Sequence, residues 1–181
     1  MNTIDNRICR TQGQFYSYMA KKKYDMNVFS DVFMHSDFCK RHFDTVYSPY
    51  QTEFPKAIFE LCMPEIETLL VRKTYMLEND RCFSESVGFI YRRLYQETNI
   101  SSAELSELIP YNEILNYFVD DGEWFEAEHK GAEGIFSDIM EKYHLPCKRY
   151  DADIKILTDE QFRKMQQDGQ IERLHIEEKY L

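Results

Sequence analysis

The chain has 181 residues, a formal net charge of −10, and 43% hydrophobic and 15% aromatic residues. This length fits one compact domain, and the apolar content is sufficient for a core, which excludes a disordered chain despite the charge. No apolar run reaches the roughly 20 residues that a membrane-spanning helix needs. The acidic balance also argues against non-specific binding of duplex nucleic acid by the surface as a whole.

The beginning of the chain and its cysteines indicate in which cellular compartment the protein is expected. Residues 1–5 have neither the charged start nor the apolar stretch of a signal peptide. The cysteines are odd in number, widely spaced and without a C-x-x-C pair: Cys9, Cys39, Cys62, Cys82 and Cys147. We therefore expect a reduced, cytoplasmic compartment, in which most thiols act as small core residues, and we expect no cofactor and no membrane contact.

The charges are distributed unevenly along the chain. Residues 1–24 carry five basic residues against one acid, whereas residues 25–146 carry 23 acidic residues against 10 basic ones. Residues 147–181 are nearly neutral, with 8 acidic and 7 basic residues. The positive first segment and the acidic body that follows it are therefore suited to different partners.

The first expected element is a helix over residues 4–19, where apolar residues recur at helical spacing. Gly13 lies in the middle of this pattern and weakens it, because glycine has low helix propensity. Two arginines lie on the polar side of the helix, and three lysines follow at its end, where the helix dipole favours positive charge. These five basic residues are Arg7, Arg10, Lys21, Lys22 and Lys23.

Four shorter helices are expected next. Asn27 is the candidate N-cap of the first of them, and Ser36 is the candidate N-cap of the second. Residues 54–61 predict a third helix of one or two turns. Pro64 then fits the first turn of a fourth helix that reaches about Met76.

Residues 87–109 form the clearest helical pair in the sequence. Asn99 ends the first helix of the pair, and Ser101 with Glu104 forms a capping box that starts the second. A further helix is expected over residues 111–119, after Pro110.

The pattern changes near the end of the chain. A last helix around residues 135–143 is followed by strand-like alternation at residues 153–157 and 171–176, with a capped helix between these two strands. We predict a mainly α fold, in which residues 1–146 form a helical bundle. Residues 147–181 are expected to form a small β-α-β appendage packed on that bundle.

Three residues have a spacing that suits metal ligation. His35, Cys39 and His42 would share a face of one continuous helix, and imidazole and thiolate are good zinc ligands. Ser36 is expected to cap a helix directly after His35, however, which would turn that histidine away. We therefore expect no metal site here and interpret Cys39 as a core thiol.

Catalysis receives no local support from the sequence. The six glycines never cluster into a phosphate-binding loop, and neighbouring acids on a helix point in different directions. A nucleophile and a base can still come together from distant positions. The enzyme hypothesis therefore stays open as an alternative, with His35, His42, His129 or a carboxylate pair such as Asp120 and Asp121 as its candidates.

The densest acidic stretch surrounds the only tryptophan of the chain. Acidic charge steers the encounter with a basic partner, and aromatic rings anchor the contact. A solvated acidic loop with the tryptophan in the core is the alternative interpretation. The candidate partner-binding residues are Asp120, Asp121, Glu123, Trp124, Phe125, Glu126 and Glu128.

Residues 89–109, FIYRRLYQETNISSAELSELI, resemble the first two helices of repressor-type helix-turn-helix domains. The segment in the place of the recognition helix, residues 110–121, departs from the pattern, because it has three acids and neither lysine nor arginine. A plain helical hairpin is the alternative. The resemblance implies a DNA-binding regulator, whose phosphate contacts would come from Arg7, Arg10, Lys21, Lys22 and Lys23.

The size, charge and aromatic content of the chain resemble those of small acidic proteins of mobile elements and phages, namely the anti-CRISPR inhibitors and the antitoxins. This resemblance implies an inhibitor that presents carboxylates where a basic, nucleic-acid-handling partner expects phosphates. We therefore favour an acidic protein-binding inhibitor. A DNA-binding regulator and an enzyme remain the alternatives.

Overall fold

The computed structural model describes residues 3–45, 48–75, 79–119 and 124–147, and the side chains among them except those of residues 3–5, 119 and 124–130. All of these residues belong to the unit Met1–Cys147. They are mainly helical, and among them the only strand-like pairing is an isolated bridge between Tyr24 and Arg72. The predicted mainly α class is thus confirmed. The predicted β-α-β appendage lies outside the described residues.

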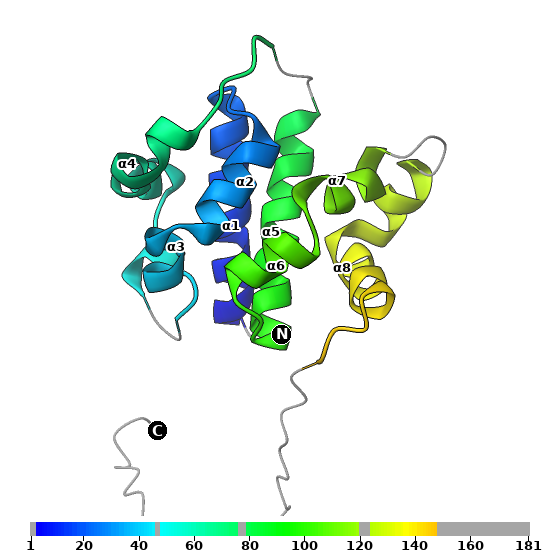
Figure 1. Cartoon of the computed structure of the whole chain (residues 1–181). Helices are drawn as coiled ribbons and strands as arrows, with labels where there is room; N and C mark the ends of the chain where they lie inside the picture. Colours follow the sequence, from blue (N-terminus) through cyan, green and yellow to red (C-terminus); the bar gives the residue numbers. More distant parts are fainter. Residues whose placement is uncertain (1–2, 46–47, 76–78, 120–123, 148–181) are drawn as a thin grey trace, which may run out of the picture. The chain divides into compact units, whose positions relative to one another are not determined.

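Two long helices lie side by side at the centre of this unit, and the shorter helices pack around them (Figure 1). The two central helices are α1 and α5. In chain order the helices are α1 (Thr3–Lys21), α2 (Met26–His35), α3 (Asp37–His42), η1 (Pro49–Thr52), α4 (Pro55–Ile66), η2 (Glu67–Leu69), α5 (Asp80–Thr98), α6 (Ser102–Leu108), α7 (Tyr111–Val119) and α8 (Trp124–Lys142), where η denotes a 3-10 helix.

Two glycines allow α1 and α5 to approach closely. A Cβ atom on Gly13 would lie 2.6 Å from the backbone oxygen of Glu85, and a Cβ atom on Gly88 would lie 2.7 Å from Cγ of Tyr16. Each glycine is therefore required by packing. The sequence pattern suggested only that Gly13 weakens its helix, whereas the structure shows that it provides the contact with α5.

Aromatic rings fill the space between α1 and α2. The ring of Phe15 lies 5.5 Å from that of Phe29 and 5.3 Å from that of Phe33, and both pairs meet edge to face. Tyr16 lies 5.1 Å from Phe29, and its hydroxyl is 3.0 Å from that of Ser30. All four rings are fully buried. Edge-to-face pairs of this kind add about 0.5–1.5 kcal/mol to the burial of their area.

Several predicted helix ends are confirmed. The Ser36 hydroxyl accepts a hydrogen bond from the Cys39 amide at 3.0 Å and begins α3. Ser101 and Glu104 form the predicted capping box of α6. Asn99 ends α5 in a left-handed conformation with φ of 64°, which asparagine adopts more readily than most residues.

Two predicted boundaries were wrong. Asp25, not Asn27, caps α2, because its carboxylate accepts the amides of Asn27 and Val28 at 3.0 and 3.3 Å. Pro64 does not start a new helix but lies inside α4, which continues to Ile66. The burial of Cys62, Met63 and Ile66 holds this last turn in place. Residues 70–75 after η2 are not helical, and Arg72 among them forms a bridge with Tyr24.

Helix α8 bends at Gly131. Gly131 has φ of 59° and ψ of −178°, which is non-helical and lies in the region that favours glycine. A Cβ atom at this position would meet nothing within 4 Å. The requirement for glycine is therefore conformational here, in contrast to Gly13 and Gly88.

The close approach of α1 and α5 leads to a stability prediction. We expect Gly88→Ala to lower the free energy of unfolding by about 1–3 kcal/mol through overpacking against Tyr16. The gain in helix propensity from alanine, at most about 1 kcal/mol, opposes this loss. Urea unfolding measures the difference. Gln14→Ala, on the exposed side of α1, is the control and should change stability by less than about 0.5 kcal/mol. A Gly88→Ala protein as stable as the wild type would contradict the close packing.

Candidate functional site

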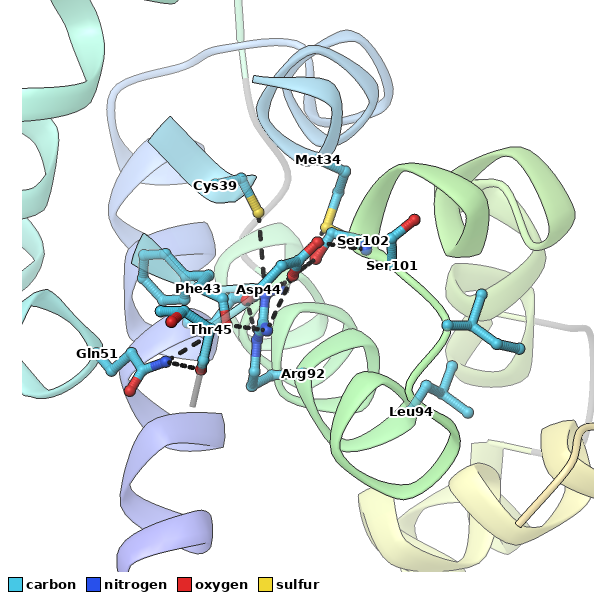
Figure 2. Close-up of polar contacts among 12 residues, drawn as sticks. Met34, Cys39, Phe43, Asp44, Thr45, Gln51, Arg92, Leu94, Ser101 and Ser102 are labelled. Atoms are coloured by element: carbon cyan, nitrogen blue, oxygen red, sulfur yellow. Dashed lines mark hydrogen bonds and ion pairs between the residues drawn. The ribbon is translucent and has the colours of Figure 1, made fainter. Parts of the chain in front are cut away.

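A buried arginine lies where four segments of the chain meet. Arg92 of α5 is 1% exposed, and Figure 2 shows it surrounded by residues from the end of α3 and the start of α6. Its Nε donates a hydrogen bond to Gln12 of α1 at 2.7 Å. Its Nη1 donates to the carbonyl oxygen of Phe43 at 2.7 Å and to Asp44 at 3.2 Å, and its Nη2 donates to the Ser102 hydroxyl at 3.0 Å.

The Asp44 carboxylate joins this arginine to the start of α6. Its Oδ2 accepts the backbone amide of Ser102 at 2.7 Å, and its Oδ1 accepts the Ser102 hydroxyl at 2.5 Å. The Asp44 side chain is only 10% exposed. Both charges of the ion pair are therefore hydrogen-bonded as well as paired, which is the condition under which a buried ion pair is tolerated.

All five donors of the Arg92 guanidinium are used within the fold. The fifth contact runs from Nη2 to the sulfur of Cys39, at 3.9 Å. Burial raises the pKa of the Cys39 thiol to about 12, although the charge of Arg92 opposes the shift. The guanidinium also lies over the rings of Phe43 and Tyr95, at 5.2 and 4.6 Å. Arg92 thus has no donor left for a ligand, and its role is to hold the junction together.

A cleft of about 370 Å³ opens beside this junction, between the α2–α3 turn and the α5–α6 turn. Asp44 and Tyr95 belong both to the wall of the cleft and to the surroundings of Arg92. His35 and Lys40 add titratable groups to the wall. The lining residues are Met34, His35, Ser36, Lys40, Asp44, Tyr95, Asn99, Ser101 and Ala103.

His35 connects α2 with α6 at the edge of this cleft. Its Nδ1 lies 2.9 Å from the Asp31 carbonyl oxygen, and its Nε2 lies 3.2 Å from the Glu107 carboxylate. The hydrogen bond to the Asp31 carbonyl is the main cause that raises the pKa of His35; Glu107 adds to the shift, and partial burial opposes it. The positive form of the imidazole therefore stabilises the contact between the two helices.

Two serines lie close to histidines, but both serve the backbone. The Ser106 hydroxyl is 3.4 Å from Nδ1 of His35, yet it donates to the Ala103 carbonyl oxygen at 2.9 Å. The Ser48 hydroxyl, 3.3 Å from Nδ1 of His42, accepts a backbone amide as the N-cap of η1. The Ser106 proton is thus used by a carbonyl oxygen, whereas Ser48 can donate its proton to His42 but is only 6% exposed, so its hydroxyl is not presented to a substrate.

The three residues with metal-ligand spacing point to different partners. His35 faces Glu107, Cys39 faces Arg92, and His42 faces Ser48. Ser36 ends α2 and caps α3, so the three residues do not lie on one continuous helix. Within the described part of the chain, histidines, cysteines and acids nowhere form a group of three that could hold a metal ion.

The predicted partner-binding stretch is described only in part. Asp120, Asp121 and Glu123 lie outside the described residues, as do the side chains of Trp124, Phe125, Glu126, Glu128 and His129. The backbone of residues 124–130 is helical and forms the first part of α8. The contact proposed for these residues therefore stays a prediction.

The predicted phosphate-contacting residues are divided between the two ends of α1. Arg7 and Arg10 lie near its start, whereas the three lysines lie at its end and directly after it. The two groups are therefore roughly 15–20 Å apart at 1.5 Å per residue. The two groups are thus separated along α1, and the phosphate contact proposed for these five residues stays a prediction.

The lysines at the end of α1 also differ in their contacts. The Lys22 ammonium lies over the rings of Tyr18 and Phe59, 5.4 and 5.5 Å from their centroids, which is cation–π geometry. Lys22 thus joins the end of α1 to α4 rather than standing free for a phosphate. The Lys23 carbonyl oxygen accepts the Lys73 amide at 2.7 Å, so this end of α1 adjoins the segment after η2.

The predicted helical pair exists as α5 and α6, and α7 follows in the place of a recognition helix. The Glu113 carboxylate of α7 accepts hydrogen bonds from Lys142 at 3.1 Å and from Tyr143 at 3.2 Å. This side of α7 is therefore engaged by the end of α8. The start of α6 is likewise engaged by Asp44.

Comparison of the chain with models of protein families, with curated proteins and with solved structures finds no match. None of the described helices is both long enough and apolar enough to cross a membrane.

The buried ion pair leads to the second stability prediction. Asp44→Ala should lower the free energy of unfolding by about 3–5 kcal/mol, because it leaves the Arg92 charge buried with fewer partners. Arg92→Met should also lower the free energy of unfolding, because it leaves the Asp44 carboxylate buried without its positive partner. In a double-mutant cycle by urea unfolding, the double variant should lose less stability than the sum of the two single losses.

The exposed pair Lys56 and Glu60, 3.8 Å apart, is the control for this cycle. Its alanine variants should change stability by less than about 1 kcal/mol, because exposed ion pairs contribute little. Strictly additive losses for Asp44 and Arg92 would show that the two residues act independently.

The raised pKa of His35 predicts a pH-dependent contribution to stability. Protonation stabilises the fold below the ordinary value of 6.5, and this contribution disappears as the pH rises through the raised value. The side chain is 37% exposed, so we expect no more than about 0.5 kcal/mol. The measurement compares wild type with His35→Gln between about pH 5 and pH 8, together with an NMR titration of the ring. A stability difference that does not vary with pH would contradict the prediction.

Proposed function

We propose that the protein binds a basic, nucleic-acid-handling partner and inhibits or neutralises it. The observation that carries this proposal is a surface formed by α2 and α6, which we call the α2–α6 acidic face. It consists of Asp31 and Glu107, which flank His35, of Glu104 at the start of α6, and of the exposed side chain of Leu108. Asp31 and Glu107 are 69% and 71% exposed, and Leu108 is 46% exposed.

The arrangement of this face suits a protein contact. Glu104, Glu107 and Leu108 are spaced three and four residues apart on α6 and so share one side of the helix. Carboxylates accelerate and orient the encounter with a basic surface, while an apolar side chain among them excludes water on contact. The cleft of about 370 Å³ beside the face offers room for a side chain of the partner.

The acidic stretch at residues 120–128 is proposed as a second contact with the same partner. It combines five carboxylates with Trp124 and Phe125. With residues 25–146 carrying 23 acids against 10 bases, the body of the chain can mimic the charge of nucleic acid toward such a partner.

The two alternatives receive less support from the described residues. A DNA-binding regulator would need a free basic helix, whereas Glu113 of α7 is paired with the end of α8. An enzyme would need an accessible nucleophile and base, whereas Ser106 beside His35 donates its proton to a carbonyl oxygen and Ser48 beside His42 is a buried N-cap. A role in protein binding requires neither a free basic helix nor a nucleophile with its base.

Charge reversal tests the α2–α6 acidic face. The partner is first captured with the full chain from a nuclease-treated lysate of the native host, and its affinity is then measured with purified proteins. We expect Glu104→Lys/Glu107→Lys to weaken binding at least tenfold, and we expect wild-type affinity to fall steeply with salt, since exposed charges are screened. Displacement of nucleic acid from the partner is the functional readout.

The matched control reverses two exposed acids elsewhere, Glu53→Lys/Glu133→Lys, and should change affinity less than threefold. Reversal of Asp120, Asp121, Glu123, Glu126 and Glu128 tests the second contact separately. If both reversed sets bind like the wild type, or if the affinity does not depend on salt, the proposal is wrong.

A further inference from the structure

The end of α1 and the segment between η2 and α5 form a basic surface, opposite in charge to the α2–α6 acidic face. Residues 70–75, which we call the edge segment, run from α4 toward α5 past the end of α1 (Figure 1). The Asp25 amide donates to the Val71 carbonyl oxygen, and the Lys73 amide donates to the Lys23 carbonyl oxygen, both at 2.7 Å. The segment is thus paired with the chain around Tyr24 in the manner of an antiparallel strand.

The other side of this strand is unpaired. Since successive residues of a strand direct their backbone groups to opposite sides, the N–H and C=O of Arg72 point away from Tyr24. No hydrogen-bond partner occupies these two groups within the part of the chain that the structure describes. Val71 is 54% exposed and Tyr75 is 71% exposed. The edge segment therefore presents the N–H and C=O of Arg72 together with the exposed side chains of Val71 and Tyr75 to solvent.

Basic side chains surround this edge. Arg72 is held in place by the ring of Tyr24, 4.7 Å from its guanidinium carbon, and by the Tyr24 hydroxyl, which accepts its Nη2 at 3.0 Å. Lys73 lies 3.7 Å from the carboxylate of Asp25. Lys21 and Lys23 are exposed, and the described residues give neither of them a carboxylate partner. Positive charge therefore exceeds negative charge here, in contrast to the acidic body.

A groove of about 450 Å³ runs along the edge segment. It is lined by Arg72, Lys73, Thr74, Tyr75 and Asp80. Four of these five residues belong to the edge segment itself and the fifth begins α5, so the groove adjoins the edge segment. This is space in which another strand can lie.

We propose that residues 71–75 bind an extended, acidic peptide segment of a partner protein as an added β-strand. The Arg72 N–H donates to a carbonyl oxygen of the peptide, and its C=O accepts a peptide N–H. Because side chains alternate across a strand, Arg72 and Lys73 lie on opposite faces, and a peptide with adjacent acidic residues places one carboxylate beside each. Nucleic acid fits less well, because it has no amide groups at strand spacing.

The test is an NMR titration of the isotope-labelled full chain. The probe is an end-capped peptide with two adjacent glutamates flanked by valines. We expect the amide resonances of Arg72 and Thr74 to shift and their hydrogen exchange to slow. The same peptide with N-methyl groups on the residues that face the edge keeps its charge but should bind at least tenfold more weakly, since methylation blocks strand pairing.

Variants of the protein complete the test. Arg72→Glu/Lys73→Glu should weaken peptide binding at least tenfold, whereas Lys40→Glu/Lys56→Glu, with the same change of charge elsewhere, should leave it within threefold. Glu104→Lys/Glu107→Lys should also leave it unchanged, which separates this proposal from the proposed function. The proposal fails if Arg72 and Thr74 do not respond at about millimolar peptide, or if the N-methylated peptide binds equally well. Tighter binding of single-stranded oligothymidylate at the same residues would also overturn it.

Discussion

The buried ion pair between Arg92 and Asp44 is the interaction on which the arrangement of the described helices depends. One guanidinium connects Gln12 of α1, the end of α3 and Ser102 of α6, which are distant from one another in sequence. Such a pair adds little net stability, because desolvation offsets the attraction, but the loss of either partner leaves a charge buried. Loss of the pair would therefore disturb all three segments at once. The position of α6, and with it the α2–α6 acidic face, follows from this junction.

The described part of the chain presents two surfaces of opposite charge. The α2–α6 acidic face displays exposed carboxylates and the side chain of Leu108, and the edge segment displays Arg72 and Lys73 beside unpaired backbone groups. Electrostatic complementarity governs the rate and specificity of association more than its strength. A chain with both surfaces is suited to contacts with a basic and an acidic region at once, in one partner or in two.

The sequence predicted local features well and long-range ones poorly. Capping residues such as Ser101 and Asn99 marked helix ends correctly, because a cap depends on residues within one turn. Pro64 was misread, since the burial of its neighbours outweighs the lost hydrogen bond of a proline within a helix. No sequence pattern predicted the junction around Arg92. Its partners lie 10 to 80 positions away, and the only local signal was an arginine within the apolar stripe of α5.

Hydroxyl-radical footprinting of the full chain, alone and bound to its captured basic partner, tests the central claim most directly, because it reports side-chain exposure residue by residue. Our account predicts that oxidation of Leu108 and His35 falls on binding, while that of Phe54, which is 81% exposed, is unchanged. Trp124 reports in the same experiment on the acidic stretch at residues 120–128. Unchanged oxidation of Leu108, His35 and Trp124 in a saturated complex would contradict the account.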